Sequence, residues 1–304
     1  MSKPTSLVDL IARFPDEEAA TKFLEKRMWP DGERHCPKCG SVGCVQDVPR
    51  KLPMPYRCTD CKRYFSMRTG TLMEHSHIPL HKWLIAIYLM MESSKGVSSV
   101  KLAEWLGLQQ KSAWFLCHRI REAIDGELAE FAGPVEMDET YIGGKERNKH
   151  RRKRIKGCSG YSGKEAVIGA KDRATGRVKA RHVPSSDKEN ALLVYCESVE
   201  WGCEVYTDES QIYNPIANRS SVNHGRGQYV KGIDTHTNGI ESFWALLKRS
   251  YAGVYHWMSP KHLHRYLAEC CGRYNSRDEG TMDRIGGVFD RMRGKRLTYR
   301  QLVG

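Results

Sequence analysis

The sequence lacks a long hydrophobic run. Its longest apolar stretch, residues 83–91, is too short to cross a bilayer and is typical of a buried helix. The first residues, MSKPTSLVDLIARFPDEEAA, lack the layout of a signal peptide, because acidic side chains follow the start closely. No internal repeat is found either. These absences argue against a membrane or secreted protein and favour a cytoplasmic one with no membrane partner.

Acidic residues are scarce relative to basic ones. The chain has 36 Asp and Glu against 49 Lys and Arg, and its formal net charge is +13 at pH 7. A balance of this kind indicates an anionic partner, with nucleic acid as the leading candidate. A soluble basic protein without such a partner has the same composition, so motifs must decide between the two. The 304 residues allow two or three domains, each with its own core.

Paired cysteines without a secretory layout indicate a reduced compartment and a metal site rather than disulfides. Two CxxC pairs, Cys36 with Cys39 and Cys58 with Cys61, have 18 residues between them. Each pair can hold one side of a tetrahedral ion, and the segment between them can form a hairpin. The alternative is that these thiols fill a core, but Lys, Arg and Pro flank them. Four thiolates predict a closed, structural zinc site, to which Cys44 is a candidate addition.

Periodicity and punctuation predict the order of elements along the chain. A helical region interrupted at Pro15 comes first, a Pro- and Cys-rich block follows, and two further helical stretches precede the first strand signals. Strands are expected near residue 134 and in EAVIGAKD, GRVKARHVP and CEVYTD, with helices at 187–199 and from 238. The predicted divisions are a helical segment 1–28, a zinc ribbon 29–78, a DNA-binding helical region 79–132 and a catalytic region 133–304.

The segment SSVKLAEWLGLQQKSAWFLCHRIREAI has the pattern of two helices around a tight turn. Ser98 or Ser99 can cap the first helix, and Gly107 lies where the turn must be. Val100 is among the residues expected to face inward, whereas Gln109, Lys111, Ser112, His118 and Arg119 are expected to face outward. The pattern favours a helix-turn-helix with Lys111 and Arg119 as DNA contacts, and an ordinary helical hairpin is the alternative.

Three carboxylates occur in apolar or tightly turning surroundings. Asp138 lies in GPVEMDETYIGG, Asp208 ends CEVYTD, and Glu241 begins the apolar helix of NGIESFWALLKRS. Each one alone is explained by a solvated strand end or helix start. Two strand-end acids and one helix acid can instead converge on divalent cations, and oxygen ligands suit Mg²⁺ or Mn²⁺.

Side-chain alternation in the first strand places Glu136 on the same face as Asp138, and Glu139 on the other. Lys248 and Arg249 lie two turns beyond Glu241 and can meet phosphates beside the metal site.

One strongly basic run, KERNKHRRKRIK at 145–156, follows the first carboxylate strand. So dense a run cannot pack against a core, and phosphates can neutralise it. A solvated loop without DNA contacts is the alternative. The candidate DNA contacts in it are Arg147, Lys149, Arg151, Arg152, Lys153 and Arg154.

Taken together, these motifs resemble the bacterial DDE insertion-sequence transposases with an N-terminal zinc ribbon, the ISXO-like group. The matching segments are CPKCG…YRCTDCKRYFSMRTGT, VEMDETYIGG, VYTDES and HTNGIESFWALLKRSYAGVYHWMSPKHLHRYLAE. The resemblance implies a multidomain α+β chain whose zinc ribbon and helix-turn-helix precede an RNase H-like α/β domain with a mixed central sheet. It assigns Asp138, Asp208 and Glu241 as the catalytic triad, with Asp138 bridging two metals.

The resemblance also implies the reaction and the partners. Hydrolysis at a transposon end would free a 3′-hydroxyl, which then attacks target DNA. The expected partners are the terminal repeats and target duplexes, bound by at least a dimer in a bacterial cytoplasm, at the nucleoid. Two rivals remain open: a zinc-ribbon transcription regulator with an idle C-terminal domain, and a metal-dependent nuclease that cuts without joining.

Overall fold

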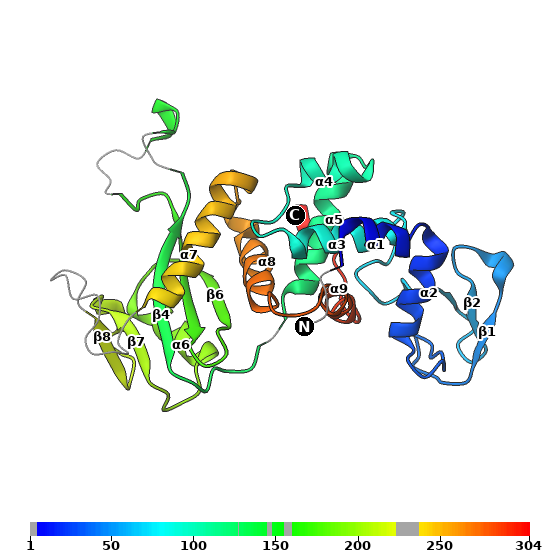
Figure 1. The fold of residues 1–304 in the computed structure, drawn as a ribbon, viewed down its shortest axis with the longest axis horizontal. Coiled ribbons are helices and arrows are strands. Elements are labelled where there is room, and N and C mark those ends of the chain that lie inside the picture. Colours follow the sequence, from blue (N-terminus) through cyan, green and yellow to red (C-terminus); the bar gives the residue numbers. More distant parts are fainter. Residues whose placement is uncertain (1–4, 127, 145–147, 155–159, 223–236) are drawn as a thin grey trace. The chain divides into compact units, whose positions relative to one another are not determined.

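The protein is described here by a computed structural model, which covers residues 5–126, 128–144, 148–154, 160–222 and 237–304 (Figure 1). The chain divides into two compact units. The first contains residues 1–126 and 278–304, and the second contains residues 127–277. Among the helices in these described ranges, none is long and apolar enough to cross a membrane.

The first unit combines helices with a small antiparallel sheet. Ser6 and Asp9 form a capping box at the start of its first helix, and the side chain of Asp16 caps the second, so the chain breaks around Pro15 as predicted. The sheet has the order β1-β2-β3. The elements are α1 (Leu7–Arg13), α2 (Glu17–Met28), β1 (Val45–Asp47), β2 (Tyr56–Cys58), β3 (Tyr64–Phe65), α3 (Leu80–Glu92), α4 (Ser99–Leu106), α5 (Gln110–Ile124), α9 (Thr281–Asp290) and α10 (Tyr299–Val303).

One hydrophobic cluster runs through the whole first unit. It includes Leu24 of α2, Phe65 of the ribbon, Trp83 of α3 and Phe289 of α9, all fully buried. The predicted segments 1–28, 29–78 and 79–132 therefore share one hydrophobic core up to residue 126.

Residues 278–304 depart from the sequence-based division, which assigned them to the catalytic region. Helix α9 packs against α2, α3 and α5 in the first unit. Arg27 of α2 donates to Asp290 Oδ2 from Nε at 3.0 Å and from Nη2 at 2.7 Å. Lys295 Nζ donates to the carbonyls of Glu122 and Asp125, at 3.0 and 2.7 Å, where α5 ends and its carbonyls lack helical partners. The apolar face of α9 is therefore buried against the N-terminal helices of the first unit.

The helix pair has the predicted boundaries. The Ser98 side chain caps α4, Gly107 ends it in the left-handed region with φ +58°, and α5 begins at Gln110. The predicted facing is wrong at Val100, whose side chain is exposed, because Leu102, Ala103 and Leu106 already cover the buried face.

The second unit is built on a mixed five-stranded sheet with the order β6-β5-β4-β7-β8. Strands β6, β5 and β4 are antiparallel neighbours, whereas β7 and β8 run parallel to β4. Strand β8 was not predicted from the sequence, which shows weak alternation there. The elements are β4 (Val135–Ile142), β5 (Glu165–Asp172), β6 (Val178–Val183), α6 (Lys188–Ser198), β7 (Val205–Asp208), β8 (Arg219–Val222), α7 (Asn238–Ser250), the π-helical turn Tyr251–Tyr255 and α8 (Leu263–Asn275).

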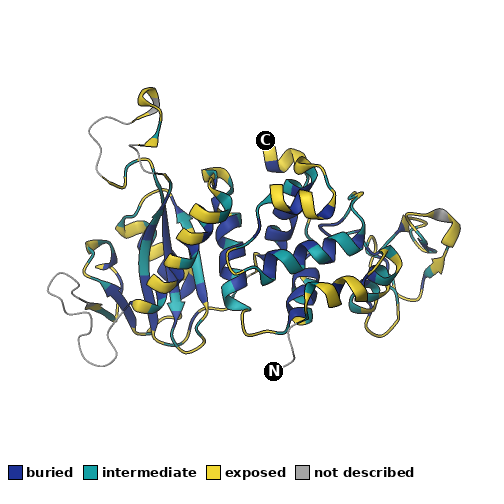
Figure 2. Ribbon diagram, turned by 45° about the horizontal axis from the view of Figure 1, so that its top comes forward, coloured by how far each residue is buried: buried dark blue, intermediate teal, exposed yellow. Residues whose placement is uncertain are grey.

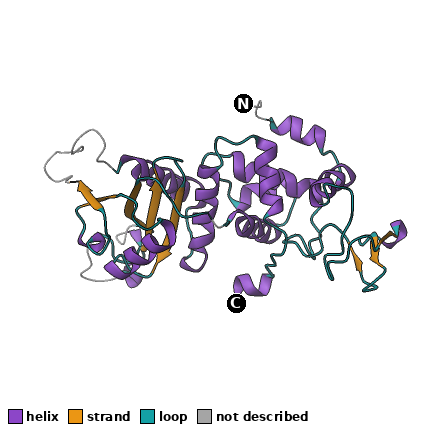
Figure 3. Cartoon of the chain, turned by 90° about the horizontal axis from the view of Figure 1, so that it is seen from below, coloured by secondary structure: helices purple, strands orange, loops and turns teal. Residues whose placement is uncertain are grey.

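Helices cover both faces of this sheet (Figure 3). Helix α6 packs on β5 and β6 on one face, over a core that includes Met137 and Ile168. Helices α7 and α8 pack on the other face, over a core that includes Val167, Phe243 and Leu267. The strands between the helices are correspondingly buried (Figure 2). The sheet between these helices carries Asp138 and Asp208. Asp208 ends β7 as predicted, whereas Asp138 lies in the middle of β4 and not at a strand end, because β4 continues to Ile142.

Candidate active site

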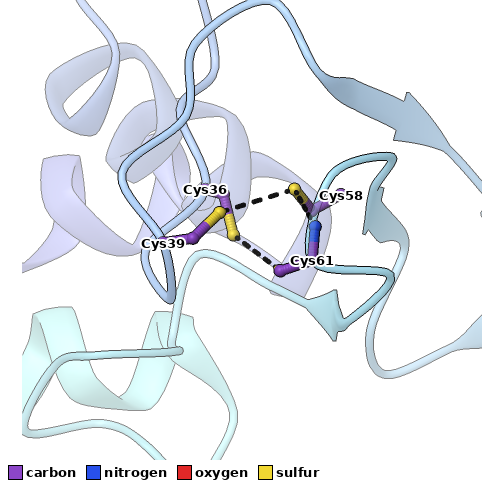
Figure 4. Close-up of side chains that lie close together, drawn as sticks. All are labelled: Cys36, Cys39, Cys58 and Cys61. Atoms are coloured by element: carbon purple, nitrogen blue, oxygen red, sulfur yellow. Dashed lines mark hydrogen bonds between the residues drawn. The ribbon is translucent and has the colours of Figure 1, made fainter.

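The four predicted zinc ligands lie together at one end of the ribbon. Sγ of Cys36 is 3.7 Å from that of Cys61, and Sγ of Cys39 is 3.7 Å from that of Cys58 (Figure 4). One ligand atom from each cysteine lies within 4.8 Å of the others. Thiolates around tetrahedral zinc, at a Zn–S distance of about 2.3 Å, stand about 3.8 Å apart. The donor set and its spacing therefore fit zinc.

Each CxxC pair sits in a tight turn whose amides point at sulfur. The amide of Lys38 donates to Cys36 Sγ at 3.4 Å, and that of Cys61 donates to Cys58 Sγ at 3.5 Å. Gly40 follows the first pair with φ +77°, and Lys62 holds the same place after the second with φ +59°. The backbone amide of Cys61 is the main cause that lowers the pKa of Cys58 to about 6.

Cys44 lies beside this set but differs from it chemically. Its Sγ is 3.4 Å from Cys58 Sγ and donates to the carbonyl of Ser41 at 3.3 Å. Burial raises the pKa of the Cys44 thiol to about 11. The four-sulfur set is complete without it, and Cys44 packs in the hydrophobic core as a neutral thiol.

A second cluster of metal-ligand type forms in the second unit, where β7 ends beside the middle of its parallel neighbour β4. Asp138 on β4, Asp208 at the end of β7 and Glu139 each place a carboxylate oxygen within 4.8 Å of the others. The parallel register pairs Val135 with Val205 and Glu136 with Tyr206, and two residues beyond these pairs Asp138 and Asp208 place their carboxylates close together. The two predicted strand carboxylates are thus adjacent.

The electrostatics of this cluster favour the binding of a cation. Burial raises the pKa of Asp138 to about 7, and the neighbouring charges of Glu139 and Asp208 add to the effect. Burial likewise raises the pKa of Glu139. Crowded carboxylates of this kind are hard oxygen donors whose charge a divalent cation would neutralise. The residues present therefore fit a Mg²⁺ or Mn²⁺ site.

Glu139 is the member that sequence reasoning missed. As predicted from alternation, the Glu139 side chain leaves β4 on the face opposite to Asp138, which is the face that α6 covers. Its carboxylate nevertheless reaches the cluster, because β7 ends at Asp208 and leaves the edge of β4 open at this point. The buried Tyr213 hydroxyl donates to Glu139 Oε2 at 2.7 Å and holds it there. The position next to Asp138 in the sequence was the available signal for Glu139 as a ligand. Strand alternation argued against that assignment, because it places neighbouring side chains on opposite faces.

Glu136 and Asp138 lie on the face of β4 opposite to Glu139, and both form hydrogen bonds with α7. Trp244 Nε1 donates to Asp138 Oδ2 at 3.0 Å. The buried Glu136 accepts the amide of Ile240 on Oε2 at 2.8 Å and Arg173 Nε on Oε1 at 2.9 Å. Glu136 therefore serves as a carboxylate cap for the first turn of α7, supplied from the strand.

Glu241 is not part of the three-carboxylate cluster. It lies exposed in the first turn of α7, and its Oε1 accepts the hydroxyl of Thr237 at 3.0 Å. Lys248 follows it by seven positions, so both lie on the same side of the helix.

A hollow of about 760 Å³ opens beside the acidic cluster. Asp138, Glu139 and Asp208 line it together with Lys248. The Lys248 ammonium group and three carboxylates thus line one hollow. This combination suits an anionic substrate whose reaction requires a bound metal ion.

The predicted DNA contacts divide into exposed and buried side chains. Lys111 is exposed, with its Nζ 4.6 Å from the ring centroid of Tyr299. The prediction that His118 and Arg119 face outward is wrong, since both are buried. Arg119 Nε donates to the carbonyl of Leu297 at 3.3 Å, and its guanidinium lies 4.1 Å from the Phe115 ring centroid. The returning C-terminal residues cover this part of α5, so Arg119 has a packing role.

The remaining basic candidates lie in the second unit. Lys248 and Arg249 are exposed on α7, as are Arg151, Arg152 and Arg154 on the segment before β5, whereas Lys149 is half-buried. Lys153 lies in the short 3₁₀ turn Arg151–Lys153. Arg147 and the ends of the basic run fall outside the described residues.

Comparison with known proteins agrees with this arrangement of sites. Residues 15–64 match the transposase zinc-ribbon domain, and residues 130–275 match the ISXO2-like transposase domain. A relative from Halobacterium salinarum is 29% identical over 263 residues, which cover 82% of this chain and 86% of that protein. It is described as an uncharacterized protein in the transposable element ISH50. The two matched domains enclose the four-cysteine cluster and the acidic cluster, so the chain combines a transposase zinc-ribbon domain with an ISXO2-like transposase domain.

Proposed function

We propose that this transposase is a DDE enzyme that cleaves transposon ends and joins their 3′-hydroxyls to target DNA. The observation that carries the proposal is that Asp138 of β4 lies beside Asp208 at the end of the parallel strand β7, next to a hollow that Lys248 also lines. The order of three antiparallel and two parallel strands supports an RNase H-like domain. Asp138, Asp208 and Glu241 would hold two divalent cations, Mg²⁺ or Mn²⁺.

Helical geometry supports Glu241 as the third acid although it stands apart from the cluster. Lys248 borders the hollow, and Glu241 lies on the same side of α7. Glu139 is the competing third ligand, because its carboxylate already lies with Asp138 and Asp208.

Each protein group has a definable part in the proposed reaction. Divalent cations, when bound, activate the attacking oxygen and stabilise the leaving one. Trp244 and Tyr213 hold the carboxylates of Asp138 and Glu139 in place through their hydrogen bonds. Lys248 would orient a phosphate in the hollow.

DNA binding is proposed for the exposed cations in both units. The first unit would use its zinc ribbon and the α4–α5 pair as a helix-turn-helix, with Lys111 as a contact. The second unit would use Lys149, Arg151, Arg152, Arg154, Lys248 and Arg249. Double-stranded ends and target DNA are the expected ligands, bound by at least a dimer.

The test is a strand-transfer assay with duplexes that carry the element's own terminal repeats. Wild-type protein with Mg²⁺ should nick the end and join it to a target plasmid, whereas Asp138→Asn and Asp208→Asn should bind DNA without cutting it. Glu209→Gln is the matched control, because Glu209 is exposed and adjacent to Asp208. Nicking without joined products would instead favour a nuclease. Binding by the wild type without any cleavage would favour the regulator.

A parallel comparison of Glu241→Gln and Glu139→Gln identifies the third ligand. If Glu241 holds metal, its variant should lose cleavage by several orders of magnitude and the Glu139 variant should lose less. The reverse order would move the assignment to Glu139.

Salt dependence tests the role of the basic segment in DNA binding. Replacing Arg151, Arg152 and Arg154 by Ala should reduce the slope of log K against log salt by about 0.9 for each phosphate that the variant no longer neutralises. An unchanged slope would mean that these side chains are only solvated.

A further inference from the structure

Aromatic and basic side chains line the hollow beside the acidic cluster, and cleavage of a phosphodiester by metal ions does not by itself require the aromatic ones. Besides the carboxylates and Lys248, its lining includes Tyr141, Tyr161, Lys164 and Tyr251. Its volume of about 760 Å³ falls in the range of pockets that enclose small organic molecules. An unmodified phosphodiester fills a small part of such a space, so a further group of the substrate has room to enter.

Tyr161 presents a largely exposed aromatic ring to the hollow. It is 63% exposed, and its ring lies on that of Tyr141 with centroids 4.3 Å apart and planes 25° apart. Tyr141 in turn packs against the core beneath the α6 face of the sheet. One ring therefore supports the other from the core side, and the exposed ring can take a third flat ring at little conformational cost.

Cations border the same platform. Lys164 Nζ lies 5.5 Å from the Tyr161 ring centroid, and Lys248 approaches from α7. Gly143, with φ +151°, brings the end of β4 close to this lysine, since a Cβ there would stand 3.2 Å from Lys164 Cα. The close approach of the two backbones fixes the lysine beside the strand that carries Asp138.

We propose that this hollow is a subsite for one unstacked nucleotide next to the phosphate that is cut, with its base on Tyr161 and its phosphate beside Lys164. The inference rests on the proposed function, because the acidic cluster defines which phosphate is cut. Stacked bases within a duplex offer no free face, so the base must leave the stack to reach the ring. Aromatic platforms beside cations bind unpaired bases without regard to sequence.

The first test measures unstacking directly. Full-length protein is mixed with terminal-repeat duplexes carrying 2-aminopurine at successive positions around the cut, in Ca²⁺ to prevent cleavage. Wild type and Tyr161→Phe should raise the fluorescence at one position, and Tyr161→Ala should not. Trp201→Ala is the matched control, since Trp201 is 82% exposed and lies outside the hollow, and it should behave as wild type.

The second test measures the consequence for cleavage in Mg²⁺. A lost stack should slow cutting of the paired duplex by Tyr161→Ala roughly 5- to 150-fold. A mismatch that leaves the same nucleotide unpaired should restore much of that rate, which a folding defect would not allow. Equal rates for Tyr161→Ala and wild type, or no fluorescence change at any position, would overturn the subsite.

Failure of the proposed function has a different signature. Wild type would then cut neither the paired nor the mismatched duplex. The fluorescence measurement needs binding alone, so it still decides whether a nucleotide enters the hollow.

Discussion

At the scale of single residues, the buried carboxylate of Asp138 lowers the free energy of unfolding of the metal-free protein. Its pKa is raised to about 7, chiefly by burial, and its ordinary value is 3.8. Between these values the folded protein holds a proton that the unfolded chain has released. Stability of the metal-free protein therefore falls as pH rises from about 4 to about 7, and the full penalty is present above that range.

Asp138→Asn removes this penalty and also removes a proposed metal ligand. Without divalent cations at pH 8, the variant should melt several degrees above the wild type, and near pH 4 the difference should vanish. With Mg²⁺ the wild type should gain stability and the variant should gain little. Thermal melts at both pH values check the sign. A variant less stable than the wild type at pH 8 without metal would contradict this account.

Lys62 offers a second prediction at this scale. It holds the left-handed position after Cys61 that Gly40 holds after Cys39. A non-glycine residue there costs about 1–2 kcal/mol of backbone strain, partly offset by the lower entropy of its unfolded chain. Lys62→Gly should therefore stabilise the zinc-loaded protein by up to about 1 kcal/mol, measured by denaturant unfolding.

Gly40→Ala is the matched counterpart of that change. A Cβ at Gly40 meets nothing within 4 Å, so backbone strain alone should destabilise this variant by about 1 kcal/mol. Equal stabilities for both variants and the wild type would mean that the turn relaxes.

At the scale of elements, α7 is held on the sheet by its first turn. Glu136 of β4 accepts the amide of Ile240, and a Cβ at Gly239 would stand 2.7 Å from Glu136 Oε2. The same Cβ would stand 2.8 Å from Lys171 Nζ, so a side chain at position 239 would have to displace the buried Glu136 carboxylate or the Lys171 side chain. This close approach sets the position of the helix that carries Trp244, Glu241 and Lys248 over the acidic cluster.

Gly239→Ala should therefore impair the site through the helix. We expect lower affinity for Mn²⁺, followed by calorimetric titration, and a fall in Mg²⁺-dependent cleavage of about tenfold or more, because small displacements of catalytic groups are costly. Gly253→Ala is the control, since a Cβ at Gly253 meets nothing within 4 Å. Wild-type metal affinity in Gly239→Ala would mean that α7 does not position the ligands.

At the scale of the whole molecule, the chain returns after α8 to complete its first unit. Removing residues 278–304 should expose the core around α3 and the carbonyl end of α5. We expect the truncated protein to lose protection from hydrogen exchange in α3 and α5, while the sheet of residues 127–277 stays protected. Uniform loss across both units, or no loss in either, would contradict the two-unit division.

Local spacing in the sequence was sufficient for much of the architecture. Two CxxC pairs at the right separation predicted the sulfur cluster, because a metal site of this kind depends on short-range turns. Ser98 and Gly107 predicted the boundaries of α4. The two strand acids were expected to converge and they do, although Asp208 alone ends its strand and Asp138 lies within β4. Each of these features depends on neighbouring residues or on a regular period.

Only the tertiary structure decided which faces meet. Glu139 joins the acidic cluster because β7 stops short and leaves an edge of β4 open, which alternation within one strand cannot reveal. Arg119 is buried because a segment almost two hundred positions away covers it. The placement of residues 278–304 likewise follows from complementarity between distant apolar faces. Local patterns state that a face must be buried, but the free energy of packing determines its partner.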